Sequence, residues 1–136
     1  PRTEKRFELD PSKFGDLSVP DAADELLAQL VRHLQPYRPD TPEWFRTGYA
    51  GLIRHRLVEQ STWSKSVPAK GDPAQAFAGG AQTAAFLYWG GQKYGGAVFQ
   101  AISQDCSHGG YREATWRTLT NKSLQEILRE YELANN

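Results

Sequence analysis

The sequence predicts a mainly helical fold, a compact orthogonal bundle of five or six helices preceded by an N-terminal extended arm. Apolar residues recur at helical spacing in several stretches, and helix-capping signatures open three of them. The length of 136 residues suits one hydrophobic core. We therefore expect an arm over residues 1–19 and one helical domain over residues 20–136.

The N-terminal third of the chain contains the arm and two expected helices. Residues 1–19 mix charges, a proline and a glycine without a sustained period, so they predict an arm with at most one short extended segment. Apolar residues then follow a helical period from Asp21 to Leu34. Thr41-Pro42-Glu43 combines an N-cap, a first-turn proline and an acid, which predicts a second helix reaching about Glu59.

The remainder of the chain predicts a loop and four more helices. Residues 61–71 lack periodicity and carry one anchor candidate, Trp63. Asp72-Pro73 repeats the cap-and-proline signature, so we expect a third helix running through Gly79-Gly80 to Trp89, although each interior glycine costs about 1 kcal/mol relative to alanine. Further helices are expected over about residues 96–106 and 111–119, and a Ser123–Glu126 capping box opens the last one.

Composition argues against several classes of partner. Lysine plus arginine number 16 and aspartate plus glutamate number 16, so no net positive charge favours nucleic acid. No stretch approaches the roughly 18 apolar residues of a membrane-spanning helix, and we expect a soluble domain without membrane insertion. The single cysteine, Cys106, cannot form an internal disulfide. The start, Pro-Arg-Thr-Glu-Lys-Arg, fits either a cleaved leader or a trimmed chain, so the sequence does not predict a cellular compartment.

Several motifs together resemble one family of peptidases. The segment Pro42–Arg54 resembles a helix of the basic secretory protein family, plant and bacterial proteins with an HExxH zincin motif, and Thr83–Trp89 looks like that family's "T-A-x-F-L" helix. The later helices are similar to its C-terminal helices, and Trp63 has a counterpart there. The resemblance covers about residues 29–132 and implies the helical half of a zincin. Only 28 residues precede it, so the strand-bearing part of the family is missing or reduced to the arm.

The departures from the family fall on its chemistry. A zincin places two histidines four apart on one helix, with a glutamate between them that handles the proton of the attacking water. The matching positions hold Gln29, Leu30 and His33. Thr47 and Gly51 replace the glutamate and aspartate of the second helix, and Gly79-Gly80 replaces a Gly-Tyr pair. Because one histidine cannot complete a zinc site, the resemblance implies a degenerate peptidase without metal or other cofactor.

Two hypotheses about function follow from these replacements. The first is a non-catalytic domain that binds a small molecule or a protein partner in the vacated cleft. The alternative is a repurposed, metal-independent enzyme acting on an apolar or aromatic small molecule there, and an active zinc peptidase is the least favoured reading. For the alternative, a neutral His33 beside Tyr49 would carry the proton transfer. The expected ligand-binding residues are Gln29, Thr47, Gly51, Trp63, Gly79, Gly80 and Trp89.

Some residues have simpler explanations. The Gly79-Gly80 pair fits either close helix packing or room for a ligand, and we expect it to face Gly51, with Trp63 and Trp89 walling the space between. His55 lies between two arginines and is expected to be a solvated surface residue. His108 precedes Gly109-Gly110 and is expected to help end a helix. Cys106 is expected to be an inert thiol.

Overall fold

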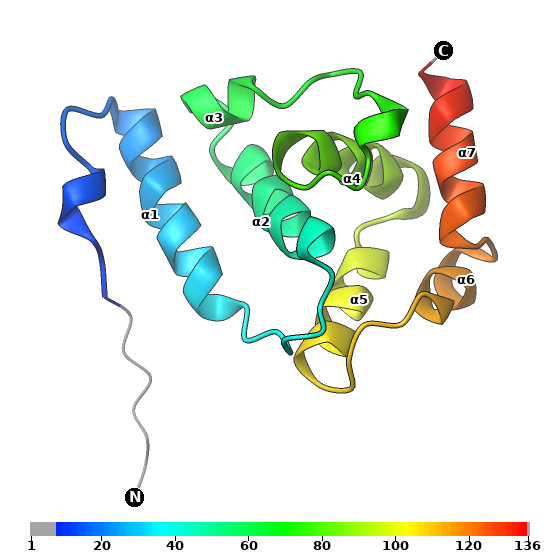
Figure 1. Ribbon diagram of the computed structural model, residues 1–136. Coiled ribbons are helices and arrows are strands. Elements are labelled where there is room, and N and C mark those ends of the chain that lie inside the picture. Colours follow the sequence, from blue (N-terminus) through cyan, green and yellow to red (C-terminus); the bar gives the residue numbers. More distant parts are fainter. Residues whose placement is uncertain (1–7, 136) are drawn as a thin grey trace, which may run out of the picture.

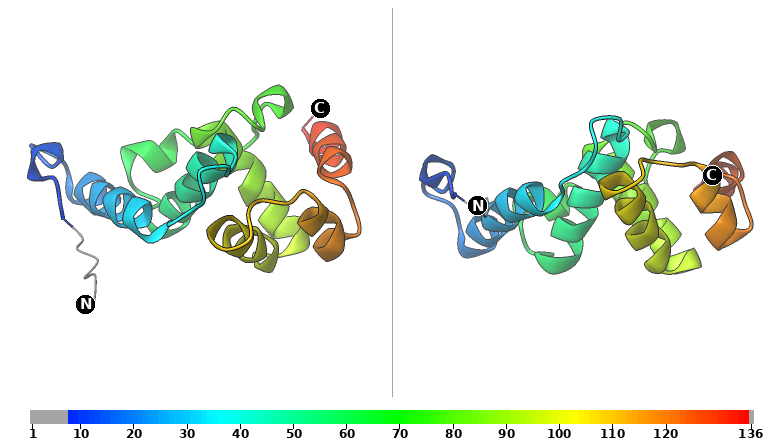
Figure 2. Two further views of the ribbon diagram at one scale, coloured as in Figure 1. Left: turned by 60° about the horizontal axis from the view of Figure 1, so that its bottom comes forward. Right: turned by 90° about the horizontal axis from the view of Figure 1, so that it is seen from below.

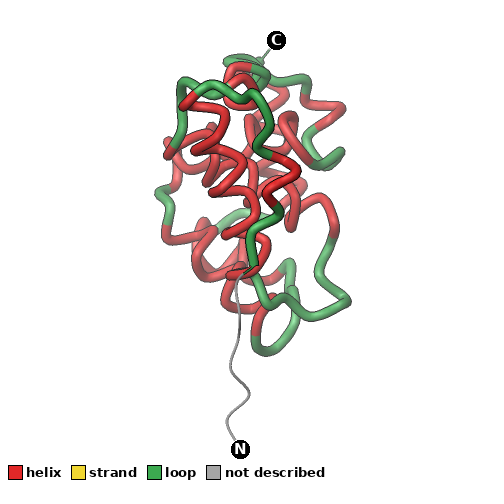
Figure 3. The backbone as a smooth tube through the Cα atoms, turned by 90° about the vertical axis from the view of Figure 1, so that its left-hand side faces the viewer, coloured by secondary structure: helices red, strands yellow, loops and turns green. Residues whose placement is uncertain are grey.

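A computed structural model describes residues 8–135 of the chain, and every regular element in that range is a helix (Figure 3). The helix axes point in several directions, with α1 at one end of the molecule and α7 at the other (Figures 1 and 2). The prediction of a mainly helical fold is therefore confirmed. The elements are η1 (Pro11–Lys13), α1 (Val19–Leu34), α2 (Glu43–Leu57), α3 (Thr62–Lys65), η2 (Pro73–Gln75), α4 (Gly80–Tyr94), α5 (Ala97–Ser107), α6 (Ala114–Thr120) and α7 (Leu124–Ala134).

Local capping explains where α1 and α7 begin. The Ser18 hydroxyl accepts a hydrogen bond from the amide of Asp21, and a proline occupies the first turn of α1. At α7, the Ser123 hydroxyl accepts from the Glu126 amide while the Glu126 carboxylate accepts from the Ser123 amide. The predicted capping box is thus formed.

The prediction of the third helix is wrong for its first half. The Asp72 carboxylate accepts from the Ala74 amide and caps only the 3-10 turn η2, after which the chain turns and α4 begins at Gly80. Gly79 and Gly80 have φ values of 87° and 59°, which L side chains rarely adopt. The glycine pair therefore lies at the start of α4 and does not destabilise the interior of a helix. The expected loop over residues 61–71 also contains α3, which the Ser61 hydroxyl caps.

The centre of the fold is the contact between α2 and α4. A Cβ placed on Gly48 would lie 2.2 Å from Cγ2 of Thr83, so only glycine permits this approach of the two helices. Thr83 is fully buried; its hydroxyl donates to the Ala76 carbonyl at 2.7 Å and accepts from the Gly79 amide at 2.7 Å. One threonine therefore fixes the turn before α4 and the packing of α4 on α2.

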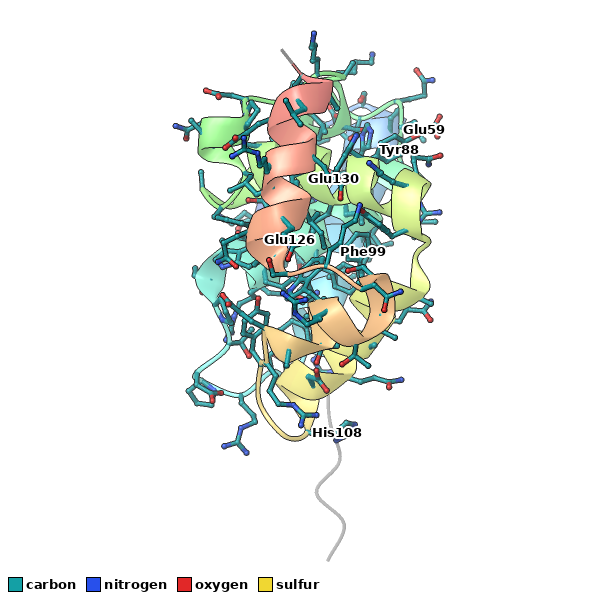
Figure 4. All side chains as sticks on the ribbon, turned by 90° about the vertical axis from the view of Figure 1, so that its right-hand side faces the viewer. Glu59, Tyr88, Phe99, His108, Glu126 and Glu130 are labelled. Carbon is teal, nitrogen blue, oxygen red and sulfur yellow. The ribbon has the colours of Figure 1, made fainter. Side chains whose placement is uncertain are left out.

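A polar cluster joins α7 to the end of α4. The Glu130 carboxylate accepts hydrogen bonds from Lys93, from Tyr94 and, at 2.6 Å, from Lys122. Figure 4 shows Glu130 one turn beyond Glu126 on α7. Hydrogen bonds from Lys122, Lys93 and Tyr94 lower the pKa of Glu130 to about 2. The cluster therefore needs the ionised carboxylate.

The stretch before α1 differs from the expected extended segment where it is described. Residues 8–18 form the single turn η1 and two short irregular connections, and residues 1–7 of the expected arm lie outside the described residues. The Gln29 side chain accepts from the Asp10 amide at 2.7 Å. Gln29 therefore attaches this stretch to one side of α1.

Candidate functional site

A cleft of about 450 Å³ opens between α1 and α2. Trp63 of α3 and Gly80 at the start of α4 line it together with side chains of both long helices. Its volume lies within the range of small-molecule sites, about 300–1,000 Å³. The lining residues are Ala28, Arg32, Gln35, Glu43, Arg46, Thr47, Ala50, Gly51, Arg54, Trp63 and Gly80.

Helical spacing explains which residues reach the cleft. On α1 and at its end, Ala28, Arg32 and Gln35 are four and three residues apart, which places them on one face. On α2, Thr47 and Gly51 follow the same rule. Each helix therefore contributes one face to the cleft.

Glycines and a threonine shape the floor of the cleft. A Cβ on Gly51 would lie 2.7 Å from the Trp63 ring, so the glycine lets the indole pack against the α2 backbone. No heavy atom lies within 4 Å of a Cβ placed on Gly80, which is open space. The Thr47 hydroxyl donates to the Glu43 carbonyl at 3.0 Å and accepts from the Gly80 amide at 3.2 Å.

Three arginines give the cleft a cationic character. Arg54 donates to both carboxylate oxygens of the buried Asp24, at 2.8 and 2.7 Å, and its guanidinium lies 4.3 Å from the centre of the Trp63 ring. Arg46 lies 3.6 Å from the exposed Glu43 carboxylate, and Arg32 is exposed at the mouth. The cleft and its immediate surroundings therefore hold three guanidinium groups and two carboxylates, an excess of positive charge.

Two donors in the cleft lack acceptors. The Nε of Arg46 and the side-chain nitrogen of Gln35 are shielded from solvent, and neither has an acceptor within hydrogen-bond distance among the described residues. The nearest acidic group to Arg46 Nε is the Glu43 carboxylate, at 3.6 Å, and the Gln35 amide lies near the Tyr37 hydroxyl. Both residues line the cleft. A buried donor without an acceptor costs about 1–3 kcal/mol, so an acceptor that enters the cleft gains from meeting them.

The structure brings together only part of the residues expected for the site. Thr47, Gly51, Trp63 and Gly80 line the cleft. The expectation that Gly51 lies near Gly80 is met. Gly79 lies beside the cleft, where a Cβ would approach the Thr47 hydroxyl to 2.6 Å.

Gln29 and His33 line a different cavity. They lie four residues apart on the side of α1 that faces the stretch before it, in an open cavity of about 480 Å³ that Asp10 and Glu25 also line. Ala28, one position before Gln29, is turned about 100° toward the cleft, and Arg32 lies between the two cavities and lines both. His33 is exposed in the last turn of α1.

Tyr49 lies on another face of α2. Its ring stacks on Phe45 with 5.4 Å between centroids and contacts Phe99 of the core. Two residues correspond to a rotation of about 200° on a helix, so Tyr49 cannot share a face with Thr47 and Gly51. Burial raises the pKa of the Tyr49 hydroxyl. The structure therefore does not form the expected pair of Tyr49 and His33.

Trp89 lines a third cavity, of about 430 Å³, between α4, α7 and the connection after α3. The expected aromatic wall opposite Trp63 is therefore absent from the cleft. His55 lines the same cavity and is half-buried, in contrast to the expected solvated residue. Its Nδ1 shares a hydrogen bond of 2.6 Å with the buried Ser64 hydroxyl. Tyr88, labelled in Figure 4, also lines this cavity, and its ring lies 5.5 Å from that of His55 between centroids.

The arginines of the cleft were not among the expected site residues, although their spacing along α2 carried a signal. Arg46, Ala50 and Arg54 are spaced four apart on α2, so they share the face that Thr47 and Gly51 flank. Gln35 follows the last residue of α1, and its position depends on how the chain leaves that helix. Only the tertiary structure places it in the lining of the cleft together with Arg46.

Among residues 8–135, no group of three or more metal-binding side chains is close enough to hold an ion. No helix in this range is long and apolar enough to cross a membrane. No family model, no curated protein and no solved structure matches the chain.

Proposed function

We propose that the protein is a non-catalytic binding domain whose cleft between α1 and α2 takes a small organic anion with a planar apolar part. We also propose, from the resemblance of its motifs, that it is a degenerate relative of the basic secretory protein family. In this view the ligand occupies the place that a peptidase cleft would have.

The observation that carries the proposal is the pair of buried donors without acceptors, Arg46 Nε and the Gln35 amide nitrogen. A carboxylate or phosphate oxygen accepts from such donors, and hydrogen bonds that involve a charged group are about twice as strong as neutral ones. Arg32 and Arg54 line the same cleft and favour the same charge. An anion therefore complements the donors and the positive charges of this cleft better than a cation or a neutral polar group does.

The rest of the cleft suits a planar apolar group. The indole of Trp63 is half-buried, and the small side chains of Ala28 and Ala50 leave room beside it. Aromatic side chains contribute large apolar contact areas with a defined geometry. A ring that stacks near Trp63 can thus place its anionic group toward Arg46.

Catalysis has less support than binding. Among the described lining residues, Glu43 is the one carboxylate, and it lies at the exposed rim beside Arg46. The histidine expected for proton transfer, His33, lines the cavity on the other side of α1. A general base within reach of the buried part of the cleft is therefore not among the described residues.

Isothermal titration calorimetry with 2-naphthoate and its neutral analogue 2-naphthamide tests the proposal. We expect the anion to bind and the amide to bind at least about tenfold more weakly. Arg46→Gln should weaken naphthoate binding by about tenfold or more because it removes the guanidinium that would bind the carboxylate. Arg117→Gln is the matched control, since Arg117 is an exposed arginine paired with Glu126 on α7. Equal binding of both compounds, or equal loss in both variants, would refute an anion site in this cleft.

A further inference from the structure

Helix α1 presents its apolar residues to solvent. The residues that it buries against the rest of the protein are Asp24, Ala28, Gln29 and Val31, which are mostly small or polar. Its large apolar side chains remain exposed instead: Val19 is 84% exposed, Leu26 42% and Leu34 64%. An amphipathic helix normally turns its leucines toward the core. Among residues 8–135, no element buries Val19, Leu26 and Leu34 of this face.

The exposed residues form one stripe. Val19, Ala23, Leu26, Leu30 and Leu34 follow one another at intervals of three or four residues, with Leu27 at the edge. Ala23 is exposed, while Leu27 and Leu30 are partly buried. The stripe has the spacing of a helix that packs lengthwise against another helix.

The order of residues in the stripe is self-complementary. If two copies of α1 are laid antiparallel about a twofold axis between Leu26 and Leu27, every apolar position meets an apolar position. Small Ala23 then meets large Leu30. The matched pairs across the axis are Val19 with Leu34, Ala23 with Leu30, and Leu26 with Leu27.

Charge favours the same direction. The acidic residues Asp21 and Glu25 lie in the first half of α1, and Arg32 and His33 lie in its last turn. Asp21 is bonded to Thr62 of the same chain and Arg32 lines the cleft, so these side chains do not pair across the interface. An antiparallel pair is favoured instead by the opposed helix dipoles and by the opposed distribution of charge along the two helices. A parallel pair would place like charges together.

We propose that the protein forms a homodimer through the α1 stripe, with the two α1 helices antiparallel and the twofold axis between Leu26 and Leu27. The partner is a second copy of this chain. Leu9 and Leu17, in the stretch before α1, are also exposed, at 48% and 41%. The interface does not use the lining of the cleft, so the dimer and the proposed anion binding can be tested separately.

Analytical ultracentrifugation of the full chain up to about 200 µM tests the assembly. The wild type should sediment with twice the chain mass of 15.3 kDa. Leu26→Glu places a charge at the centre of the pair in both copies and should weaken dimerisation by about a hundredfold or more, with an unchanged circular dichroism spectrum. Leu133→Glu is the control, since Leu133 is 68% exposed on α7. A monomeric wild type, or a Leu26→Glu variant that remains dimeric, would overturn the proposal.

Disulfide trapping tests whether the two α1 helices of the dimer run antiparallel. In one α1 helix, positions 19 and 34 are about 22 Å apart along the axis, too far for an internal disulfide. The double variant Val19→Cys/Leu34→Cys should form a cross-linked dimer on mild oxidation, whereas Leu34→Cys alone should not. The native thiol, Cys106, is fully buried and does not interfere. A cross-link in the Leu34→Cys variant alone would show a parallel pair and contradict the antiparallel arrangement.

Discussion

Replacing Asp24 with asparagine removes the charge that holds Arg54 at the joint between α1 and α2. Asp24 is 5% exposed and binds both ends of the Arg54 guanidinium, at 2.8 and 2.7 Å. Breaking a buried ion pair by removing one partner costs about 3–5 kcal/mol. Because the Arg54 side chain is 21% exposed and keeps its contact with Trp63, we expect a smaller loss of about 2–3 kcal/mol.

This loss converts into a measurable melting shift. An unfolding entropy of about 2.1 cal/mol/K per residue gives about 0.29 kcal/mol/K for 136 residues, so each kcal/mol lowers Tm by about 3.5 °C. Asp24→Asn should therefore lower Tm by about 7–10 °C. Urea unfolding monitored by circular dichroism gives the free energy directly, and the exposed Glu132→Gln on α7 is the control. A loss below about 0.5 kcal/mol would refute the view that this pair attaches α1.

Three other predictions concern single positions. Gly51→Ala should abolish ligand binding, since the new methyl group displaces the Trp63 ring, whereas Gly80→Ala should cost about 1 kcal/mol through its positive φ alone; calorimetry and urea unfolding separate the two effects. The free energy of unfolding should decrease as the pH is lowered from about 4.5 to about 2, because the pKa of Glu130 is lower in the folded chain than in the unfolded one and protonation therefore favours unfolding. In acid titrations of the Glu130→Gln variant, this part of the pH dependence should be missing. The Cys106 thiol is fully buried and its burial raises its pKa, so a maleimide should label it only after urea unfolds the chain.

The sequence predicts those elements whose signals are local. The capping box at Ser123 and the helical period of α1 act within one or two turns, and the structure contains both helices. The helix predicted after Thr41 also forms, but the predicted cap is wrong: Pro42 takes the cap position without a side-chain hydrogen bond, and α2 begins at Glu43. The turn at Gly79 was not predicted because its cause is tertiary. Thr83 accepts the Gly79 amide only because Gly48 lets α4 approach α2 so closely.

The residues of the cleft were also predicted only in part. Thr47, Gly51, Trp63 and Gly80 were expected in one site and line one cleft. The errors arose where the rotation along a helix was not followed: Gln29 and His33 lie on the next face of α1, and Tyr49 on another face of α2. The direction in which a helix turns its apolar stripe is also not fixed by the pattern alone, and α1 turns its own outward.

The close packing at Gly48 and the polar attachment of α1 give the two walls of the cleft different mechanical properties. The α2 wall shares a backbone-close contact with α4, so it moves only as part of the core. The α1 wall is held by the Asp24–Arg54 pair, by Asp21 bonded to Thr62 and by a few small side chains. Widening of the cleft would therefore require α1 to move away from α2. Such a movement would break the Asp24–Arg54 pair and the Asp21–Thr62 hydrogen bonds but would leave the core folded.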